Sequence, residues 1–213
     1  MNERNHASST DSPEASQERP AVVRYLEALR DKERRLRLVL DSAHLGMWEW
    51  DVRANHSEWN AQMYELLGLP AGDGHESTDV FMRCIHPDDL AAVNRSLAVA
   101  FNEGGLWREE FRIIRPTGEV RWVAGAGRIH GDAAAGSLRM LGVNYDITDR
   151  KRAETSLRDS EQRFRSAFAQ AAIGFALTTV EGYYLDANPA FVALTGYSLH
   201  ELRTMRLEAL IHF

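Results

Sequence analysis

The chain has 213 residues, 44% hydrophobic and 26% charged, a composition typical of globular proteins and sufficient for one domain and part of another. Its apolar runs are far shorter than the roughly 20 residues that cross a bilayer, so we expect no membrane segment and a cytoplasmic location. The single cysteine, Cys84, excludes an intrachain disulfide and a multi-cysteine metal site. A net charge of -6 argues against a nucleic-acid partner, because phosphate contacts need a concentrated basic surface.

The first predicted elements are a tail and a helix. Residues 1–20 are rich in Ser, Glu, Pro and Asn and poor in large apolar side chains, which predicts a disordered tail. Over residues 21–43 apolar side chains recur at helical spacing, and Leu26, Leu29 and Leu36 lie on the resulting stripe. This segment is therefore predicted to be an amphipathic helix.

The middle of the chain is predicted to contain strands around a short helical section. A helical section with Pro- and Gly-containing loops separates the second and third strands, and its longest helix is expected to start near Asp88. A second charged, heptad-patterned helix is predicted at 150–168. Five segments alternate apolar and polar residues between turn signals and are predicted as strands: 47–52, 55–59, 107–115, 119–129 and 137–147.

An internal repeat relates the two halves of the chain. A shift of 128 residues pairs identical residues without a gap, among them Gly46 with Gly174 and Asn60 with Asn188. The second copy lacks counterparts of the long helix and of the last three strands. The remaining strands lack partners, so residues 161–213 are not expected to form a stable domain alone.

Four motifs carry a family resemblance, and they are Trp-Glu-Trp-Asp at 48–51, Ile-His-Pro-Asp-Asp at 85–89, Pro-Thr-Gly-Glu-Val-Arg-Trp-Val at 116–123 and Asp-Ile-Thr-Asp-Arg-Lys at 146–151. The sequence resembles a PAS domain of the S-box type with a PAC motif. That resemblance implies an α+β fold, in which a five-stranded antiparallel sheet carries short helices on one face and encloses a small cavity. The apolar stripes at 21–43 and 150–168 predict amphipathic, coiled-coil-type helices on either side of this domain.

The resemblance also sets the expected domain organisation and function. PAS modules sense a ligand, a cofactor or a redox state, or they dimerise, and they act on a fused output domain. We expect a sensory region of a bacterial signalling protein such as a two-component sensor histidine kinase or a diguanylate cyclase. The expected parts are a tail at 1–20, a helix at 21–43, a PAS domain at 44–149, a linker helix at 150–168 and half of a second PAS domain at 169–213.

The junction between the last strand and the linker helix is a candidate signalling site. Asp146 and Thr148 can cap backbone N–H groups where the helix starts, or pair with a cation such as Arg150. In the family these positions resemble a switch between sheet and output helix. A second interpretation is that they only end the strand and cap the helix.

The apolar stripes of the two helices are candidate dimer contacts. Leu26, Leu29 and Leu36 in the first helix, with Leu157 and Phe164 in the second, predict coiled-coil pairing into a homodimer. The alternative is that each stripe packs on its own sheet. A PAS domain with a filled core that binds no ligand and serves only dimerisation or partner docking is the competing function.

The sequence identifies neither a cofactor nor a catalytic site. The five tryptophans can hold a flat ligand such as flavin, but they fall in predicted strands, where aromatic residues also pack across the sheet. The eight histidines show no metal-binding spacing, whereas haem needs one axial ligand. Cys84 is predicted to be a buried, inert thiol. No catalytic motif is found, so the chain itself is not expected to be an enzyme, and flavin, haem or another small-molecule ligand stays open.

Overall fold

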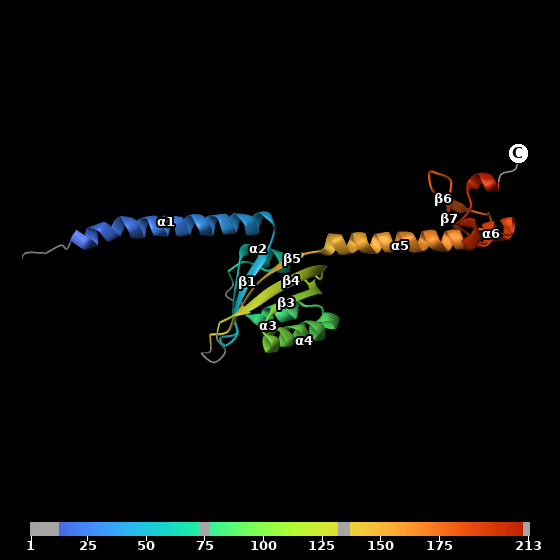
Figure 1. Cartoon of the computed structure of the whole chain (residues 1–213). Coiled ribbons are helices and arrows are strands. Elements are labelled where there is room, and N and C mark those ends of the chain that lie inside the picture. Colours follow the sequence, from blue (N-terminus) through green and yellow to red (C-terminus); the bar gives the residue numbers. More distant parts are fainter. Residues whose placement is uncertain (1–12, 73–76, 132–136, 211–213) are drawn as a thin grey trace, which may run out of the picture. The chain divides into compact units, whose positions relative to one another are not determined.

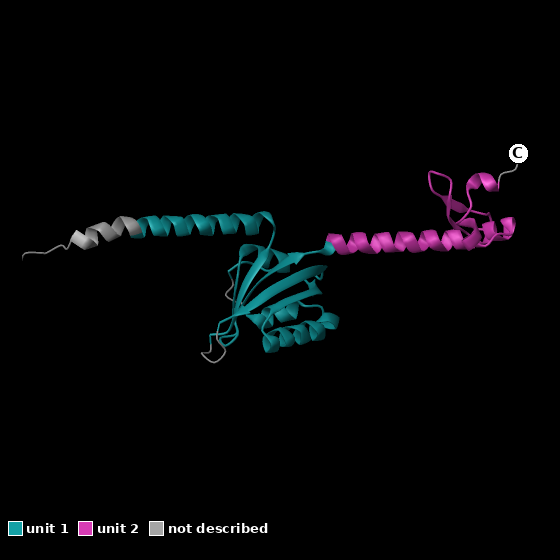
Figure 2. Ribbon diagram, in the orientation of Figure 1, with its two compact units in different colours: residues 1–148 teal, residues 149–213 magenta. Residues whose placement is uncertain are grey.

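The computed structural model describes residues 13–72, 77–131 and 137–210 of the chain (Figure 1). The chain divides into two compact units, Met1–Thr148 and Asp149–Phe213 (Figure 2). Within the described residues no helix is both long and apolar enough to span a membrane.

Helix α1 (Pro13–Ser42) starts earlier than the sequence predicts. Residues 13–20 were expected to belong to a disordered tail but are helical, while residues 1–12 lie outside the described part of the chain. The helix in this segment has a local cause, because its Glu, Ala, Gln and Arg residues favour a helix and proline is tolerated at a helix start. The structure thus includes residues 13–20 in α1, whereas their composition predicts a tail.

Unit 1 contains the five-stranded antiparallel sheet and the helices that cover it, which confirms the predicted α+β fold (Figure 1). The strands lie in the order β2-β1-β5-β4-β3. Three helices connect β2 to β3 and pack on one face of the sheet. The bounds are β1 (Gly46–Asp51), β2 (His56–Trp59), α2 (Ala61–Leu67), α3 (Thr78–Cys84), α4 (Pro87–Glu103), β3 (Leu106–Ile114), β4 (Val120–His130) and β5 (Arg139–Asp146).

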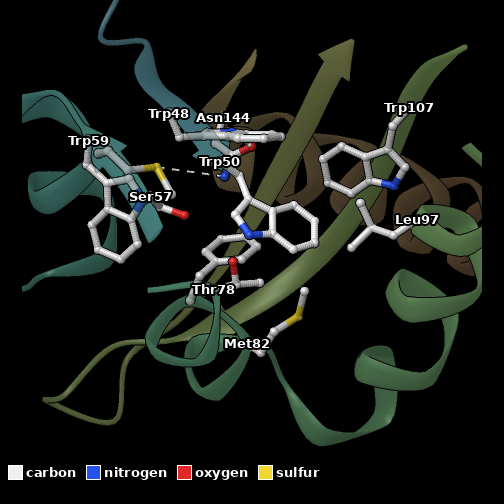
Figure 3. A pocket seen from close by; sticks show the side chains of 11 residues that line it. Trp48, Trp50, Ser57, Trp59, Thr78, Met82, Leu97, Trp107 and Asn144 are labelled. Carbon is white, nitrogen blue, oxygen red and sulfur yellow. Dashed lines mark hydrogen bonds between the residues drawn. The ribbon is translucent and has the colours of Figure 1, made fainter. Parts of the chain in front are cut away.

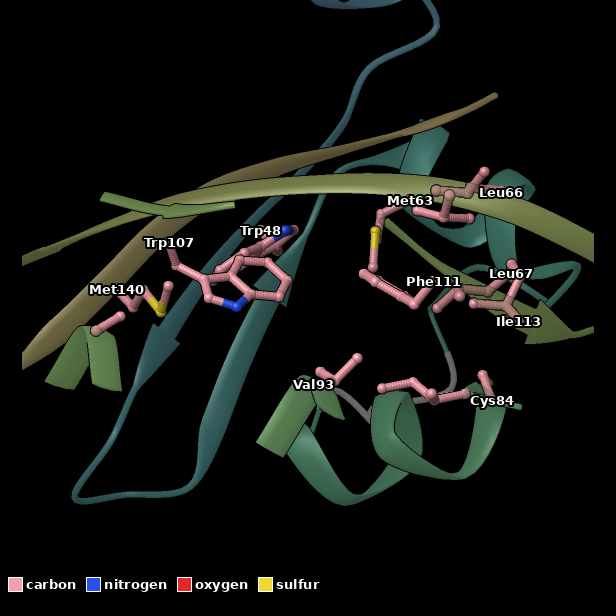
Figure 4. Packing of buried hydrophobic residues seen from close by; sticks show 13 residues of the cluster. Trp48, Met63, Leu66, Leu67, Cys84, Val93, Trp107, Phe111, Ile113 and Met140 are labelled. Atoms are coloured by element: carbon pink, nitrogen blue, oxygen red, sulfur yellow. The ribbon is translucent and has the colours of Figure 1, made fainter. Parts of the chain in front are cut away.

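The core of unit 1 lies between the sheet and α2–α4 (Figure 4). Met63 of α2, Val93 of α4 and Phe111 of β3 are at most 1% exposed. Trp48 of β1 lies over Gly142, its partner on β5. A Cβ atom on Gly142 would overlap the Trp48 ring and lie 2.6 Å from the carbonyl oxygen of Ala126, so a residue without a side chain is required there.

The edge strand β3 is covered by the turn that precedes α4. The His86 N–H donates to the carbonyl oxygen of Arg112 at 2.8 Å, and the Arg112 N–H donates to Asp89 Oδ2 at 2.8 Å. The Arg112 guanidinium also pairs with Asp89 Oδ1 at 2.7 Å. The turn thus uses backbone groups that would otherwise stay open on an exposed sheet edge. Asp88 lies in the first turn of α4, as predicted.

Unit 2 consists of a long helix and a small α/β region. Residues Tyr184, Ala187 and Leu202 form its buried cluster. The sheet has two strands, which agrees with an incomplete second PAS domain. The elements are α5 (Thr148–Gln170), whose first residue belongs to unit 1, β6 (Ala176–Thr178), β7 (Tyr184–Ala187), α6 (Pro189–Thr195), α7 (Leu199–Leu202) and the 3-10 helix η1 (Leu207–Ala209).

The sequence repeat is also a repeat of structure. In unit 1, Asn60 Oδ1 accepts from the N–H groups of Met47 at 2.8 Å and Met63 at 3.0 Å, while its Nδ2 donates to the Leu45 carbonyl at 2.9 Å.

The equivalent Asn188 makes the same connections in unit 2. It accepts from the N–H groups of Phe175 at 2.8 Å and Phe191 at 2.9 Å, and it donates to the Ile173 carbonyl at 2.9 Å. Each asparagine therefore caps a helix and holds the start of the first strand of its unit against that helix.

Candidate functional site

A cavity of about 40 Å³ lies in unit 1 between the sheet and helices α3 and α4 (Figure 3). A buried water needs about 10–15 Å³, so the cavity has room for a few waters or a small organic group. Its wall contains no charged side chain. The lining residues are Trp48, Trp50, Ser57, Trp59, Met63, Thr78, Phe81, Met82, Leu97, Trp107 and Asn144.

Two of the tryptophans in the wall are fixed by hydrogen bonds. Trp48 Nε1 donates to Asn144 Oδ1 at 3.0 Å, and Trp107 Nε1 donates to Ser96 Oγ at 2.9 Å. The rings of Trp48 and Trp107 meet edge to face, with centroids 6.2 Å apart. This part of the wall is therefore held in one geometry by both polar and aromatic contacts.

Two other polar atoms in the wall have no partner. Trp50 Nε1 and Thr78 Oγ1 are the buried side-chain nitrogen and oxygen atoms without a hydrogen bond among the described residues. Both belong to residues that line the cavity, and in Figure 3 the indole nitrogen and the hydroxyl point to the same part of it. A buried polar group without a partner is costly, so this region of the cavity favours a hydrogen-bonding occupant.

The cavity does not fit the large cofactors that the sequence left open. Pockets for drug-sized ligands and cofactors usually occupy about 300–1,000 Å³, whereas this cavity measures about 40 Å³. The described residues also contain no group of three His, Cys, Asp or Glu side chains that could hold a metal. As arranged in this structure, this cavity does not accommodate a flavin ring or a haem.

Cys84 belongs to the core cluster and does not line the cavity. It is buried, as predicted, and its thiol donates to the Val80 carbonyl at 3.4 Å. Burial raises the pKa of the Cys84 thiol, while Arg83 lowers it to a smaller degree. The thiol form is therefore favoured, which disfavours nucleophilic chemistry at this residue.

The predicted junction residues Asp146 and Thr148 lie together at the end of β5. The Thr148 N–H donates to Asp146 Oδ1 at 2.7 Å, while Asp146 Oδ2 accepts from Arg121 Nη1 of β4 at 2.7 Å. In turn, the Trp122 N–H donates to Thr148 Oγ1 at 3.0 Å. The first residue of α5 is thus connected directly to two neighbouring strands.

The positive charge beside Asp146 comes from Arg121, a residue whose side-chain direction could not be predicted from the sequence. Burial raises the pKa of the Asp146 carboxyl, but hydrogen bonds from Thr148 and Arg121 outweigh it and hold that pKa below its ordinary value. Arg150, the cation considered from the sequence, pairs with Glu154 one turn along α5 at 2.8 Å. Arg121 supplies the positive charge beside Asp146 because the β4–β5 register brings it there.

The predicted dimer residues are exposed along α1 and α5. Leu36 of α1 is 56% exposed, and Leu157 and Phe164 of α5 are 63% and 54% exposed. Leu26 and Leu29 are likewise exposed. None of these residues belongs to either buried cluster, so the described structure gives no support to packing of the stripes on the sheets.

A surface hollow occurs at the equivalent place in each unit. In unit 1 it measures about 380 Å³ and is lined by Leu36, Leu40 and the segment 60–62 among others. In unit 2 it measures about 500 Å³ and includes Phe164 and Phe168. Because Leu36 and Leu40 correspond to Phe164 and Phe168 in the repeat, the same kind of helix-lined hollow recurs 128 residues later.

Comparison with known proteins identifies the two units. A family model described as "PAS fold" matches residues 56–144, and one described as "PAS domain" matches residues 162–213. The chain contains tandem PAS domains. The first PAS domain holds the cavity and the junction, and the second corresponds to the smaller unit.

The relatives of these PAS domains include a sensor protein and a probable diguanylate cyclase. The sensor protein FixL of Bradyrhizobium diazoefficiens is 25% identical over 61% of this chain and 26% of its own length. The probable diguanylate cyclase DgcE of Escherichia coli is 22% identical over 84% of this chain and 16% of its own length. The non-motile and phage-resistance protein of Caulobacter vibrioides is 29% identical over 81% of this chain and 20% of its own length. The chain thus spans about a quarter or less of each of these relatives.

A solved structure supports the same assignment. The sensory box histidine kinase/response regulator from Burkholderia thailandensis E264 matches with a TM-score of 0.51 and 29% identity. The match covers 62% of this chain and 98% of that one. The tandem PAS domains are therefore related to PAS regions of sensor histidine kinases and diguanylate cyclases.

Proposed function

We propose that the first PAS domain detects a small molecule in its tryptophan-lined cavity and passes the resulting change to α5. The receiving output is a histidine kinase or diguanylate cyclase region outside these residues, as the names of the relatives suggest. The chain contributes sensing and transmission, and the catalytic step belongs to the output region.

Strand β5 connects the cavity to the start of α5. On β5, Asn144 lines the cavity and accepts the hydrogen bond of Trp48, and two residues later Asp146 binds Arg121 and the first residue of α5. A shift of β5 at the cavity therefore acts on the hydrogen bonds that start the helix. A single residue separates the end of β5 from Thr148, so little chain is available to absorb such a shift.

Dimerisation is the second function that a specific observation favours. The stripe on α1, with Leu29 and Leu36, and the stripe on α5, with Leu157 and Phe164, are each exposed, which is unfavourable unless another surface covers them. We propose that a second copy of the chain covers each stripe with the same helix of the partner, in a parallel coiled coil. A dimer of this kind gives α5 a partner against which a rotation or a change of register can be transmitted.

Transmission can be tested without knowing the ligand. Ser57 is 5% exposed and lines the cavity, so Ser57→Val adds apolar volume there in the manner of an occupant. We expect Ser57→Val to change the hydrogen exchange of amides 151–156 in α5, measured by mass spectrometry on residues 1–213. In an Asp146→Ala background this effect should be lost, because the connection between β5 and α5 is cut.

The control is Ser42→Val, the same substitution at the exposed end of α1. It should leave the exchange of α5 unchanged. If Ser57→Val alters exchange in the sheet but not in α5, or alters α5 equally with and without Asp146, transmission through this junction is wrong and the dimerisation function is favoured.

A further inference from the structure

The unpartnered polar atoms of the cavity indicate the chemistry of its occupant. We propose that the cavity binds a small, uncharged organic molecule whose carbonyl or similar oxygen accepts a hydrogen bond from Trp50 Nε1. This inference rests on the proposed sensory function and specifies the class of ligand for that same cavity.

The polar groups that the wall leaves available are mainly donors. The indole N–H of Trp50 can only donate, and the Thr78 hydroxyl can donate or accept. Asn144 Oδ1 already accepts from Trp48, whereas Asn144 Nδ2 donates only weakly, to Met63 Sδ at 3.8 Å. An occupant that accepts hydrogen bonds can therefore satisfy both open groups, whereas a pure donor can satisfy only Thr78.

The absence of charge in the wall selects a neutral acceptor. Carboxylates and phosphates are strong acceptors, but a buried anion without a cation beside it pays a large desolvation penalty. The eleven side chains in the wall include no Lys, Arg or His. A ketone, an ester, an amide or an ether gains the same hydrogen bond from Trp50 at a much smaller desolvation cost.

Size and shape restrict the molecule further. The volume of about 40 Å³ admits a short chain or one small ring rather than a fused ring system. Trp48, Trp50, Trp59 and Trp107 present aromatic surfaces around it, while Met63 and Met82 are flexible side chains that can adjust to an occupant. The other part of the ligand is thus expected to be apolar and compact.

A matched pair of probes tests this chemistry. Cyclopentanone and methylenecyclopentane have the same ring and nearly the same shape, but only the ketone accepts a hydrogen bond. Binding to residues 1–213 is measured by titration calorimetry. We expect cyclopentanone to bind about tenfold more tightly, the ratio that corresponds to one hydrogen bond of about 1.4 kcal/mol.

Variants assign the difference to Trp50. Trp50→Phe keeps an aromatic ring and removes the N–H, so it should lower the affinity for cyclopentanone about tenfold and leave methylenecyclopentane unchanged. Trp122→Phe makes the same change at a tryptophan outside the cavity wall and should alter neither affinity. Thr78→Val keeps the shape of the side chain and reports the smaller contribution of the hydroxyl.

The outcomes separate this inference from the proposed function. Equal binding of both probes, tighter binding of the hydrocarbon, or no binding of either probe overturns the proposed ligand class. Those results leave the Ser57→Val exchange experiment intact as a test of transmission. Conversely, selective binding of cyclopentanone together with no response in α5 supports the ligand class and overturns the sensory function.

Discussion

Asp89 shows how one side chain can hold an edge strand and the start of a helix together. Its carboxylate accepts from the backbone and the guanidinium of Arg112, and Asp89 itself lies in the first turn of α4. The hydrogen bonds from Arg112 hold the pKa of the Asp89 carboxyl below its ordinary value, although burial opposes the shift. Its ionised form is therefore more stable in the folded protein than in the unfolded chain.

Asp89→Asn is expected to reduce the free energy of unfolding by about 1–3 kcal/mol at pH 7, because hydrogen bonds to a charged group are lost. A lowered pKa stabilises the fold above the ordinary carboxyl value of about 3.9, and this stabilisation is lost as the pH falls through the folded-state pKa. The difference from the parent should therefore shrink below about pH 4. Urea unfolding followed by tryptophan fluorescence at several pH values measures it.

The neighbouring Asp88→Asn is the control for this experiment. The Asp88 side chain is 71% exposed and lies 3.4 Å from Arg112, so its effect should be clearly smaller. An Asp89→Asn variant whose loss of stability is the same at pH 7 and pH 3 would show that the charge of Asp89 does not stabilise this contact.

Among the elements, β5 depends on a close approach between backbone and indole. Gly142→Ala places a methyl group into the Trp48 ring and near the Ala126 carbonyl, which the packed sheet cannot avoid by a small shift. We expect a loss of about 1–3 kcal/mol in the free energy of unfolding. Gly105→Ala is the matched control, because a Cβ atom there has no neighbour within 4 Å. Chemical unfolding that gives equal stabilities for the two variants would contradict this account of the sheet.

The exposed stripe of α1 leads to a prediction about self-association. Leu36→Glu places a charge on the proposed dimer contact and should weaken dimerisation at least tenfold, as measured by sedimentation over a range of concentrations. Leu38→Glu is the same change at a residue that is 68% exposed and lies off the stripe, so it should have little effect. If the parent is monomeric at high concentration, or if both variants weaken association equally, the stripe is not the dimer contact.

The elements of the first PAS domain could be read from the sequence, while their side-chain partners could not. The alternation of apolar and polar residues located all five strands of its sheet, because one face of each strand packs on the core. The pairing of Arg121 with Asp146 depends on the β4–β5 register, and alternation alone could not say whether Arg121 or Trp122 faces inward. The lack of a hydrogen-bond partner for the Trp50 N–H could not be predicted either, because it depends on which side chains from several elements surround the indole in the folded domain.

At the scale of the whole molecule, the repeat allows the same substitution to be compared in the two units. Tryptophan fluorescence allows the unfolding of unit 1 to be followed separately. All five tryptophans precede residue 149, so tryptophan emission reports unfolding of unit 1. Asn60→Ala removes a helix cap and leaves the Met47 N–H without its side-chain acceptor, and should cost about 2 kcal/mol in the tryptophan-monitored transition.

The equivalent Asn188→Ala should leave that transition unchanged and instead reduce the helical signal that remains at moderate urea. Circular dichroism provides this second measurement. An effect of Asn188→Ala on the tryptophan transition as large as that of Asn60→Ala would show that the units unfold together rather than separately.

The two-stranded sheet of unit 2 also affects how the chain behaves at high concentration. Strand β1 of unit 1 lies between β2 and β5, whereas its counterpart β6 pairs with β7 alone in the part of the chain that the structure describes. An open strand edge is a template for strands from other molecules, and Leu177 on β6 is 41% exposed. We therefore expect intermolecular β-aggregation through β6 at high concentration, and we expect Leu177→Lys to reduce it, because a charge on an edge strand opposes pairing with another chain.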